Sequence, residues 1–165
     1  NYNSTFAIKT DGTLWAWGQG DYGKLGVNQP ANSSYSSPRQ VPGTTWRRVR
    51  SLTYGCGAVK TDGTLWTWGR NDSYGQLGLN DRTNRSSPTQ VPGTTWNNIF
   101  AGGSDHFIVT KTDGTLWGIG RGGNGGLAQG NNTNYSSPVQ IPGTDWNYAA
   151  SGKGAASYAI QQIEP

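Results

Sequence analysis

Short runs of alternating large apolar and small or polar residues, separated by loops that contain glycine, extend along the whole chain. In the run Leu65–Gly69 the side chains of Trp66 and Trp68 share one face of a strand, while Leu65 and Thr67 share the other. The Asp-Gly pair before this run predicts a tight hairpin, because both central residues of a type I′ turn need positive φ. Since no segment shows a helical period over ten residues, the pattern predicts an all-β chain.

The middle of the chain shows how many strands one unit contains. Four short β-type runs, separated by turn-forming residues, are predicted at Tyr54–Lys60, Leu65–Gly69, Pro88–Val91 and Trp96–Phe100. A glycine-punctuated loop, Asn71–Gly78, connects the second run to the third. Four antiparallel strands in about fifty residues are typical of one blade of a β-propeller.

This unit is written roughly three times. The hexapeptide Thr-Asp-Gly-Thr-Leu-Trp occurs at Thr10–Trp15, Thr61–Trp66 and Thr112–Trp117. A longer motif, Ser-Ser-Pro-x-Gln-(Val/Ile)-Pro-Gly-Thr-x-Trp, occurs at Ser36–Trp46, Ser86–Trp96 and Ser136–Trp146. Copies of the hexapeptide are 51 residues apart, and a fixed period of this size indicates a propeller or a solenoid. The sequence therefore predicts three four-stranded antiparallel blades of a partial propeller, with repeats at 1–50, 51–101 and 102–153 and a terminal strand at 154–165.

The two ends of the chain duplicate each other, because Thr5–Lys9 aligns with Ser157–Gln161. A ring that closes on itself would draw different strands of a shared blade from its two ends. We therefore expect an open array, with further repeats before Asn1 or with copies of the chain joined edge to edge. The single repeat domain would then belong to a longer chain or to a homo-oligomer.

Composition narrows the function classes. With 8 Trp, 8 Tyr and only 13% charged residues, the chain has the aromatic content of a folded core and not the composition of a disordered segment. Cys56 and His106 stand alone, which disfavours an internal disulfide, a Cys/His metal site and a His-dependent triad. No run of eighteen apolar residues predicts a membrane span. The net charge of +4 includes one cluster, Arg47, Arg48 and Arg50, which is too small to predict nucleic-acid binding.

Three stretches of the chain resemble a known family. The regulator of chromosome condensation repeat, in the sequence variant of its microbial and phage versions, is closely similar to the stretches Asp11–Gly18, Tyr74–Gly78 and Ser86–Pro92. The resemblance implies a β-propeller, usually a seven-bladed one, that binds proteins through its faces. It carries over no catalytic residue and no cofactor, because no catalytic motif belongs to the repeat itself.

Positions that differ between otherwise matched repeats are the best candidates for recognition, because the constant positions encode the scaffold. They lie just after the recurrent tryptophan and in the glycine-punctuated loop, where the simpler reading is an ordinary solvated loop. Tyrosine and arginine are frequent anchors of protein interfaces. The predicted partner-binding residues are Arg47, Arg48, Arg50, Tyr22, Tyr74, Asn97, Asn98 and Tyr148.

The recurrent tryptophans and aspartates each allow two readings. Pairs such as Trp66/Trp68 form either a platform for sugars or the packing between blades, and their fixed place in the unit favours packing. The aspartate of each Asp-Gly hairpin is read as a turn residue and not as an acid or a metal ligand. His106, at the entrance to an apolar run, is expected to have a structural role.

These observations predict a non-enzymatic structural or protein-binding module without a cofactor. Its partner would be another protein or further copies of itself, and its location extracellular, on a virion appendage or in a secreted bacterial protein. Two alternatives stay open: a lectin-like adhesin that binds glycans, and an inhibitor or regulator that docks through a propeller face. An enzyme is the least favoured class, because the sequence contains no catalytic cluster.

Overall fold

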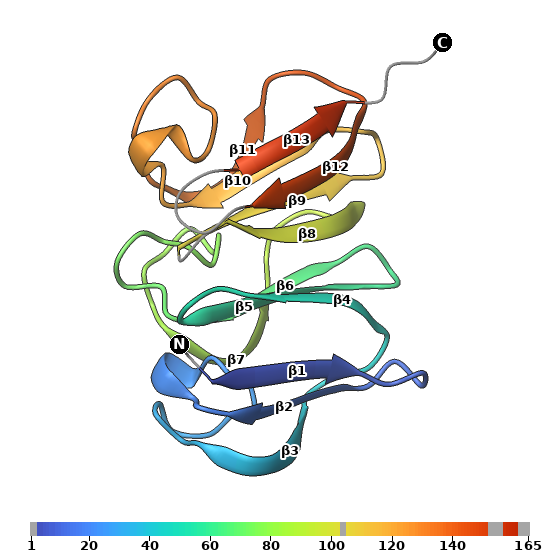
Figure 1. The fold of residues 1–165 in the computed structure, drawn as a ribbon, viewed down its shortest axis with the longest axis vertical. Coiled ribbons are helices and arrows are strands. Elements are labelled where there is room, and N and C mark those ends of the chain that lie inside the picture. Colours follow the sequence, from blue (N-terminus) through green and yellow to red (C-terminus); the bar gives the residue numbers. More distant parts are fainter. Residues whose placement is uncertain (1–2, 103–104, 152–156, 162–165) are drawn as a thin grey trace.

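A computed structural model describes residues 3–102, 105–151 and 157–161, and the regular elements in these ranges are β-strands and two short 3₁₀ turns (Figure 1). In chain order the elements are β1 (Ser4–Ile8), β2 (Leu14–Gly18), η1 (Asp21–Gly23), β3 (Tyr35–Val41), β4 (Trp46–Ser51), β5 (Gly55–Lys60), β6 (Leu65–Gly69), β7 (Arg85–Gln90), β8 (Trp96–Gly102), β9 (His106–Lys111), β10 (Leu116–Gly120), η2 (Gly123–Gly125), β11 (Tyr135–Ile141), β12 (Trp146–Ser151) and β13 (Ser157–Gln161).

Within the described residues, the strands form four sheets that follow one another along the long axis of the molecule (Figure 1). Their strand orders are β1-β2-β3, β4-β5-β6-β7, β8-β9-β10-β11 and β12-β13. Neighbouring strands of a sheet are consecutive in the chain and antiparallel, as in the blades of a propeller. The predicted fold class, an all-β partial propeller with antiparallel blades, is confirmed.

The boundary between blades falls at a different point from the one that the sequence suggested. The strand that opens with Trp96, β8, pairs with β9 of the following sheet and not with β7. The hairpin of the preceding blade holds the start of this strand, because the amide of Trp96 donates to the carbonyl oxygen of Gly63 at 2.9 Å. Grouping Trp96–Phe100 with the three strands before it is therefore wrong. Each recurrent tryptophan begins a blade, which leaves three described strands in the first sheet and two in the last.

The Asp-Gly hairpins are present, but their turns are not of type I′. Between β1 and β2 the amide of Lys9 donates to the oxygen of Thr13, and the amide of Gly12 donates to the oxygen of Lys9, both at 2.9 Å. Of these turn residues only Gly12 has positive φ, at 78°. The loop is thus a turn closed by one left-handed glycine, which is the usual three-residue hairpin. Asp11 accepts hydrogen bonds from the amide and the hydroxyl of Thr13, which confirms it as a turn residue.

The apolar core lies between blades and not inside them. One cluster joins the first and second sheets and includes Leu14, Val41, Trp46, Ala58 and Trp68. Two further clusters join the second sheet to the third and the third to the fourth. Each of the two middle sheets therefore buries both of its faces against neighbours, as expected for stacked repeats.

The prediction that Trp66 and Trp68 pack between blades is confirmed: Trp68 is fully buried, and Trp66, which is partly exposed, packs against the same inter-blade cluster. Trp68 is 0% exposed, and its indole Nε1 donates to the backbone oxygen of Lys24 in the preceding blade at 2.8 Å. Trp66 is half-buried, and its Nε1 donates to Thr64 Oγ1, in its own hairpin, at 2.8 Å. Trp68 is therefore an inter-blade packing residue, while Trp66 keeps part of its surface open.

Candidate protein-binding surface

Three strands from successive blades come together in the molecule. β4, β8 and β12 are each an edge strand of their own sheet, and β8 contacts both of the others. Figure 1 shows them one above another. They carry most of the positions that vary between repeats, so the fold gathers residues that lie about fifty positions apart in the sequence. The inner-strand surface is the part of these strands formed by Arg47, Arg48, Arg50, Asn97 and Asn98.

A bulge in β4 sets which of its side chains face outward. The register against β5 shifts between Trp46 and Arg48, so these two residues no longer share a face of the strand. Trp46 and Val49 then pack into the core between the first two blades, whereas Arg48 and Arg50 are exposed. The same shift occurs after the first residue of β8.

The three arginines of β4 differ in how firmly they are held. The guanidinium of Arg47 reaches across to β8 and donates to the backbone oxygen of Asn97 and, at 3.4 Å, to its Oδ1. Arg50 donates to the backbone oxygen of Val49 at 3.0 Å, and Arg48 has no hydrogen-bond partner among the described residues. Arg47 therefore links two blades, while Arg48 and Arg50 keep most of their donors available for a partner.

No described acidic residue neutralises the positive charge of this surface. The ion pairs of the described residues are Arg70–Asp72 at 2.8 Å, Arg85–Asp81 at 2.6 Å and Arg121–Asp105 at 3.8 Å. None of these pairs includes an arginine of β4. A ligand that offers carboxylates to this surface would meet guanidinium groups without an acidic competitor in the described part of the chain.

Tyr22 and Tyr74 lie on the loops that follow β2 and β6, and they pack against the next blade. Tyr22 meets Tyr54 edge to face at 5.1 Å, and the guanidinium of Arg70 lies 4.9 Å from the centre of the Tyr22 ring. Arg121 lies 5.1 Å from the ring of Tyr74 in the same way. These cation–π contacts join the loop of one blade to its neighbour. Sequence analysis missed the two arginines, although their 51-residue spacing marks them as one repeated position.

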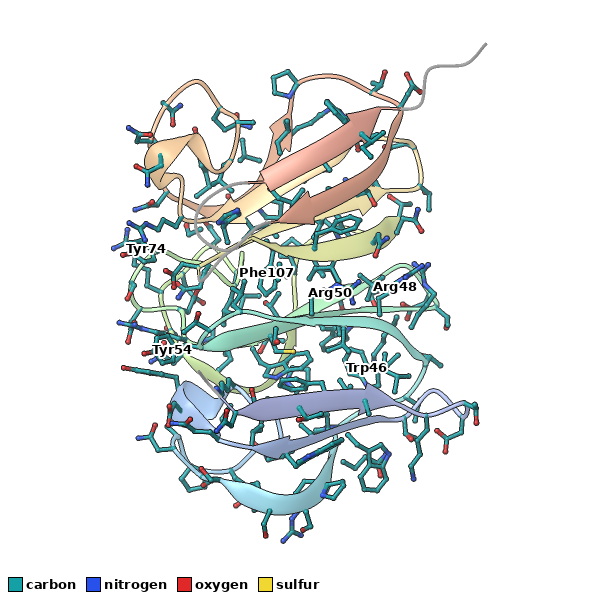
Figure 2. All side chains as sticks on the ribbon, in the orientation of Figure 1. Trp46, Arg48, Arg50, Tyr54, Tyr74 and Phe107 are labelled. Atoms are coloured by element: carbon teal, nitrogen blue, oxygen red, sulfur yellow. The ribbon has the colours of Figure 1, made fainter. Side chains whose placement is uncertain are left out.

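The structure thus separates the predicted partner-binding residues into two groups. Figure 2 shows Tyr54 and Tyr74 on the opposite side of the molecule from Arg48. The two loop tyrosines are half-buried in contacts within the chain, so they are weaker candidates than the arginines. Tyr148 belongs to β12, but its side chain lies outside the described residues.

The titratable groups show structural roles. Among the described residues, no group of three or more His, Cys, Asp or Glu side chains could hold a metal ion. Cys56 is buried, and its desolvation raises the pKa of the thiol well above the ordinary value. The hydroxyl and amide of a threonine two residues ahead lower the pKa of each hairpin carboxylate, at Asp11, Asp62 and Asp113. The described part of the chain contains no helix long and apolar enough to cross a membrane.

His106 gives the protein a testable pH dependence. Its side chain is 3% exposed at the start of β9, and its burial, with a smaller effect from the charge of Arg121, lowers its pKa to about 4. The pKa of an unfolded histidine is about 6.5, so the unfolded chain takes up this proton first as the pH falls. The free energy of unfolding should therefore be unaffected above pH ~6.5 and decrease by about 3 kcal/mol as the pH falls towards 4.

Urea denaturation across this pH interval, followed by circular dichroism, tests the assignment. We expect the wild type to lose stability as the pH falls and the variant His106→Gln to show a flatter profile. Burial raises the pKa of the neighbouring Asp105, which acts in the opposite sense in both proteins and so cancels in the comparison. Identical profiles for the two proteins would show that His106 does not carry the effect.

Antiparallel sheets that bury their faces against one another, repeated with a period of about fifty residues, define a β-propeller repeat protein. The sequence profile of the regulator of chromosome condensation (RCC1) repeat matches residues 11–59 and 62–109, which is more than half of the chain. The chain belongs to the RCC1 repeat family.

Several known proteins are similar to this chain over part of their length. Human E3 ubiquitin-protein ligase HERC2 is 31% identical over 135 residues, which is 73% of this chain and 3% of HERC2. The structure of human WBSCR16 superposes with a TM-score of 0.82 at 21% identity, covering 98% of this chain and 43% of that protein. Prp20p from Saccharomyces cerevisiae, whose binding to Gsp1p and histones has been characterised, superposes with a TM-score of 0.79 at 20% identity. The superposition covers 92% of this chain and 40% of Prp20p. This chain spans less than half of each of these proteins, and the two structures show a shared fold.

Proposed function

We propose that this chain is a non-enzymatic protein-docking module whose inner-strand surface binds the partner. The observation that carries the proposal is the row of exposed arginines on β4, which no described carboxylate neutralises. A partner with a carboxylate-rich segment would supply the complementary charge. Charge complementarity of this kind contributes mainly to specificity and to the rate of association.

Two further observations support this surface. The tryptophan that opens β4, β8 and β12 is constant, whereas the next two positions change from Arg47-Arg48 to Asn97-Asn98, so the scaffold is kept while the exposed chemistry varies. Arg47 is already oriented by its bonds to Asn97 and would lose little conformational freedom when a partner binds. Prp20p, which has the same fold, binds Gsp1p and histones, and this supports protein binding as the task of such a propeller.

Replacing Arg48 and Arg50 together by serine is expected to weaken the binding of a fluorescent oligo-glutamate peptide about tenfold. Both side chains are exposed, so the fold should be retained. The matched control replaces Arg39 and Arg82, which are also exposed but lie outside the inner-strand surface. Fluorescence anisotropy at low salt measures the affinity of each variant. An equal loss in the control would show that net charge alone drives binding and would contradict a defined surface.

Finer assignments remain predictions. The relatives reported above are human and yeast proteins. They do not support the predicted location on a virion or in a secreted bacterial protein, nor the predicted microbial or phage-like version of the repeat. Association of several copies has one supporting feature: Ile160 in β13 is 62% exposed, whereas Val59 at the matching position of the second blade is 0% exposed. A regulator or inhibitor would use the inner-strand surface, whereas a lectin-like adhesin needs a separate sugar site.

A further inference from the structure

A pocket with aromatic walls lies at the junction of the first and second blades. Its volume is about 390 Å³, which is within the range of small-ligand sites. Its lining residues include Asn28, Pro42, Trp46, Lys60, Trp66 and Ser87. The pocket thus combines two indole rings with one ammonium, one amide and one hydroxyl group, and it shares no residue with the inner-strand surface.

The two tryptophans of the pocket hold the lysine in place. The rings of Trp46 and Trp66 meet edge to face, with their centroids 6.2 Å apart and their planes at 80°. The ammonium of Lys60 lies 4.7 Å from the centroid of Trp46 and 4.4 Å from that of Trp66. Contact with two aromatic rings restricts a long side chain that would otherwise move freely. The pocket therefore presents a positive charge at a defined point of its wall.

The electrostatics of the pocket favour an anion. Lys60 is the only charged residue among its described lining. The nearby carboxylate of Asp62 accepts hydrogen bonds from the amide and hydroxyl of Thr64, at 3.0 and 2.7 Å. The indole Nε1 of Trp46 is buried and has no acceptor among the described residues, and the same holds at Trp96 and Trp146, so this is a feature of the repeat and not of the pocket. An anionic ligand would gain from the ammonium of Lys60.

The same arrangement recurs one blade further along the chain. The rings of Trp96 and Trp117 lie 6.0 Å apart at 81°, and the ammonium of Lys111 is 4.8 and 4.4 Å from their centroids. The indole Nε1 of Trp96 also has no acceptor among the described residues. Asn80 and Ser137 stand at the positions that correspond to the amide and hydroxyl of the first site.

The outer blades lack the complete set. In the first blade the ammonium of Lys9 lies 4.2 Å from the centroid of the Trp15 ring. The described residues that precede β1 in the chain include no second tryptophan to pair with Trp15. In the last blade Gln161 stands opposite Trp146, where the middle blades have lysine. The described part of the chain therefore contains two complete sets of paired tryptophans with a lysine, and Lys9 provides an internal control.

We infer that these two sites bind acidic saccharides, one sugar to each. The apolar C–H face of a pyranose ring packs on the open part of Trp66 or Trp117, and the ring carboxylate pairs with Lys60 or Lys111. The amide and hydroxyl groups of the lining bind the ring hydroxyls. A neutral sugar would match the aromatic wall and leave the ammonium without a partner, so the carboxylate is the group that gives the sites their preference.

Titration of the whole chain with methyl β-glucuronide and with methyl β-glucoside tests the inference. The two probes share one ring and differ only in carrying a carboxylate or a hydroxymethyl group. We expect the glucuronide to shift the indole N–H resonances of Trp66 and Trp117 in NMR spectra, with two sugars bound per chain. The glucoside should bind about tenfold more weakly, the scale of one charge-assisted hydrogen bond.

Single substitutions assign the sites. Lys60→Gln should abolish the shift at Trp66 and leave that at Trp117, whereas the control Lys9→Gln should leave both. Equal affinity for the two probes, shifts confined to other tryptophans, or no shift at millimolar glucuronide would overturn the inference. If Lys60→Gln fails to fold, the comparison of the two probes on the unchanged protein still decides between these outcomes.

Discussion

Replacing Trp68 by alanine is expected to lower the free energy of unfolding by about 3–5 kcal/mol, the typical loss for a large aromatic residue in a core. The side chain is 0% exposed and packs edge to face against Phe6 at 6.5 Å and Trp46 at 6.1 Å, one from each of the first two blades. The substitution also leaves the backbone oxygen of Lys24 without its 2.8 Å hydrogen bond. Urea denaturation followed by far-ultraviolet circular dichroism measures the loss.

Trp66→Ala is the matched control, because it removes the same side chain from the same strand. Trp66 is half-buried and bonds to its own hairpin, so a smaller loss of stability is expected there. Equal losses at the two positions would show that the contacts of Trp68 with the preceding blade are not what makes it important. A loss confined to Trp66 would overturn the assignment of Trp68 to the inter-blade core.

The contrast between these two tryptophans shows how far the pattern of residues predicts the fold. Alternation correctly places Trp66 and Trp68 on one face of β6. It does not predict which of them a neighbouring blade covers, because the covering loop around Lys24 lies more than forty residues earlier in the chain. Local periodicity therefore predicts the face of a strand, while the depth of burial depends on contacts between repeats.

The blade boundary and the division of the candidate residues into two groups escaped prediction for a related reason. A repeat has no natural starting point in sequence, and only the pairing of β8 with β9, in which Trp96 lies opposite Lys111, shows that the tryptophan begins a blade. Because each recurrent tryptophan begins a blade, β4, β8 and β12 take equivalent edge positions in successive sheets, and β8 contacts the other two. The varying positions were found from the sequence, but their division into an arginine surface and half-buried loop tyrosines depends on the packing between blades.

Gly69→Ala is expected to lower the free energy of unfolding by about 2–6 kcal/mol, the sum of backbone strain and overpacking. Gly69 ends the Trp-x-Trp-Gly phrase of β6 and has a φ of 104°, in a region that residues with a Cβ rarely adopt. A Cβ at this position would lie 2.4 Å from the carbonyl oxygen of Tyr54 and 2.6 Å from the Cα of Gly55. Both atoms belong to the backbone and cannot move aside as a flexible side chain would.

Gly130→Ala separates the two contributions to this loss. Gly130 has a φ of 68°, but a Cβ there would meet no atom within 4 Å, so only the backbone strain remains. We expect Gly130→Ala to cost about 1 kcal/mol, and Gly69→Ala to exceed it by the cost of the clash. Thermal and urea denaturation of both variants give the difference. Equal losses would mean that the backbone of β5 yields to the added methyl group, and that the phrase needs glycine for its φ alone.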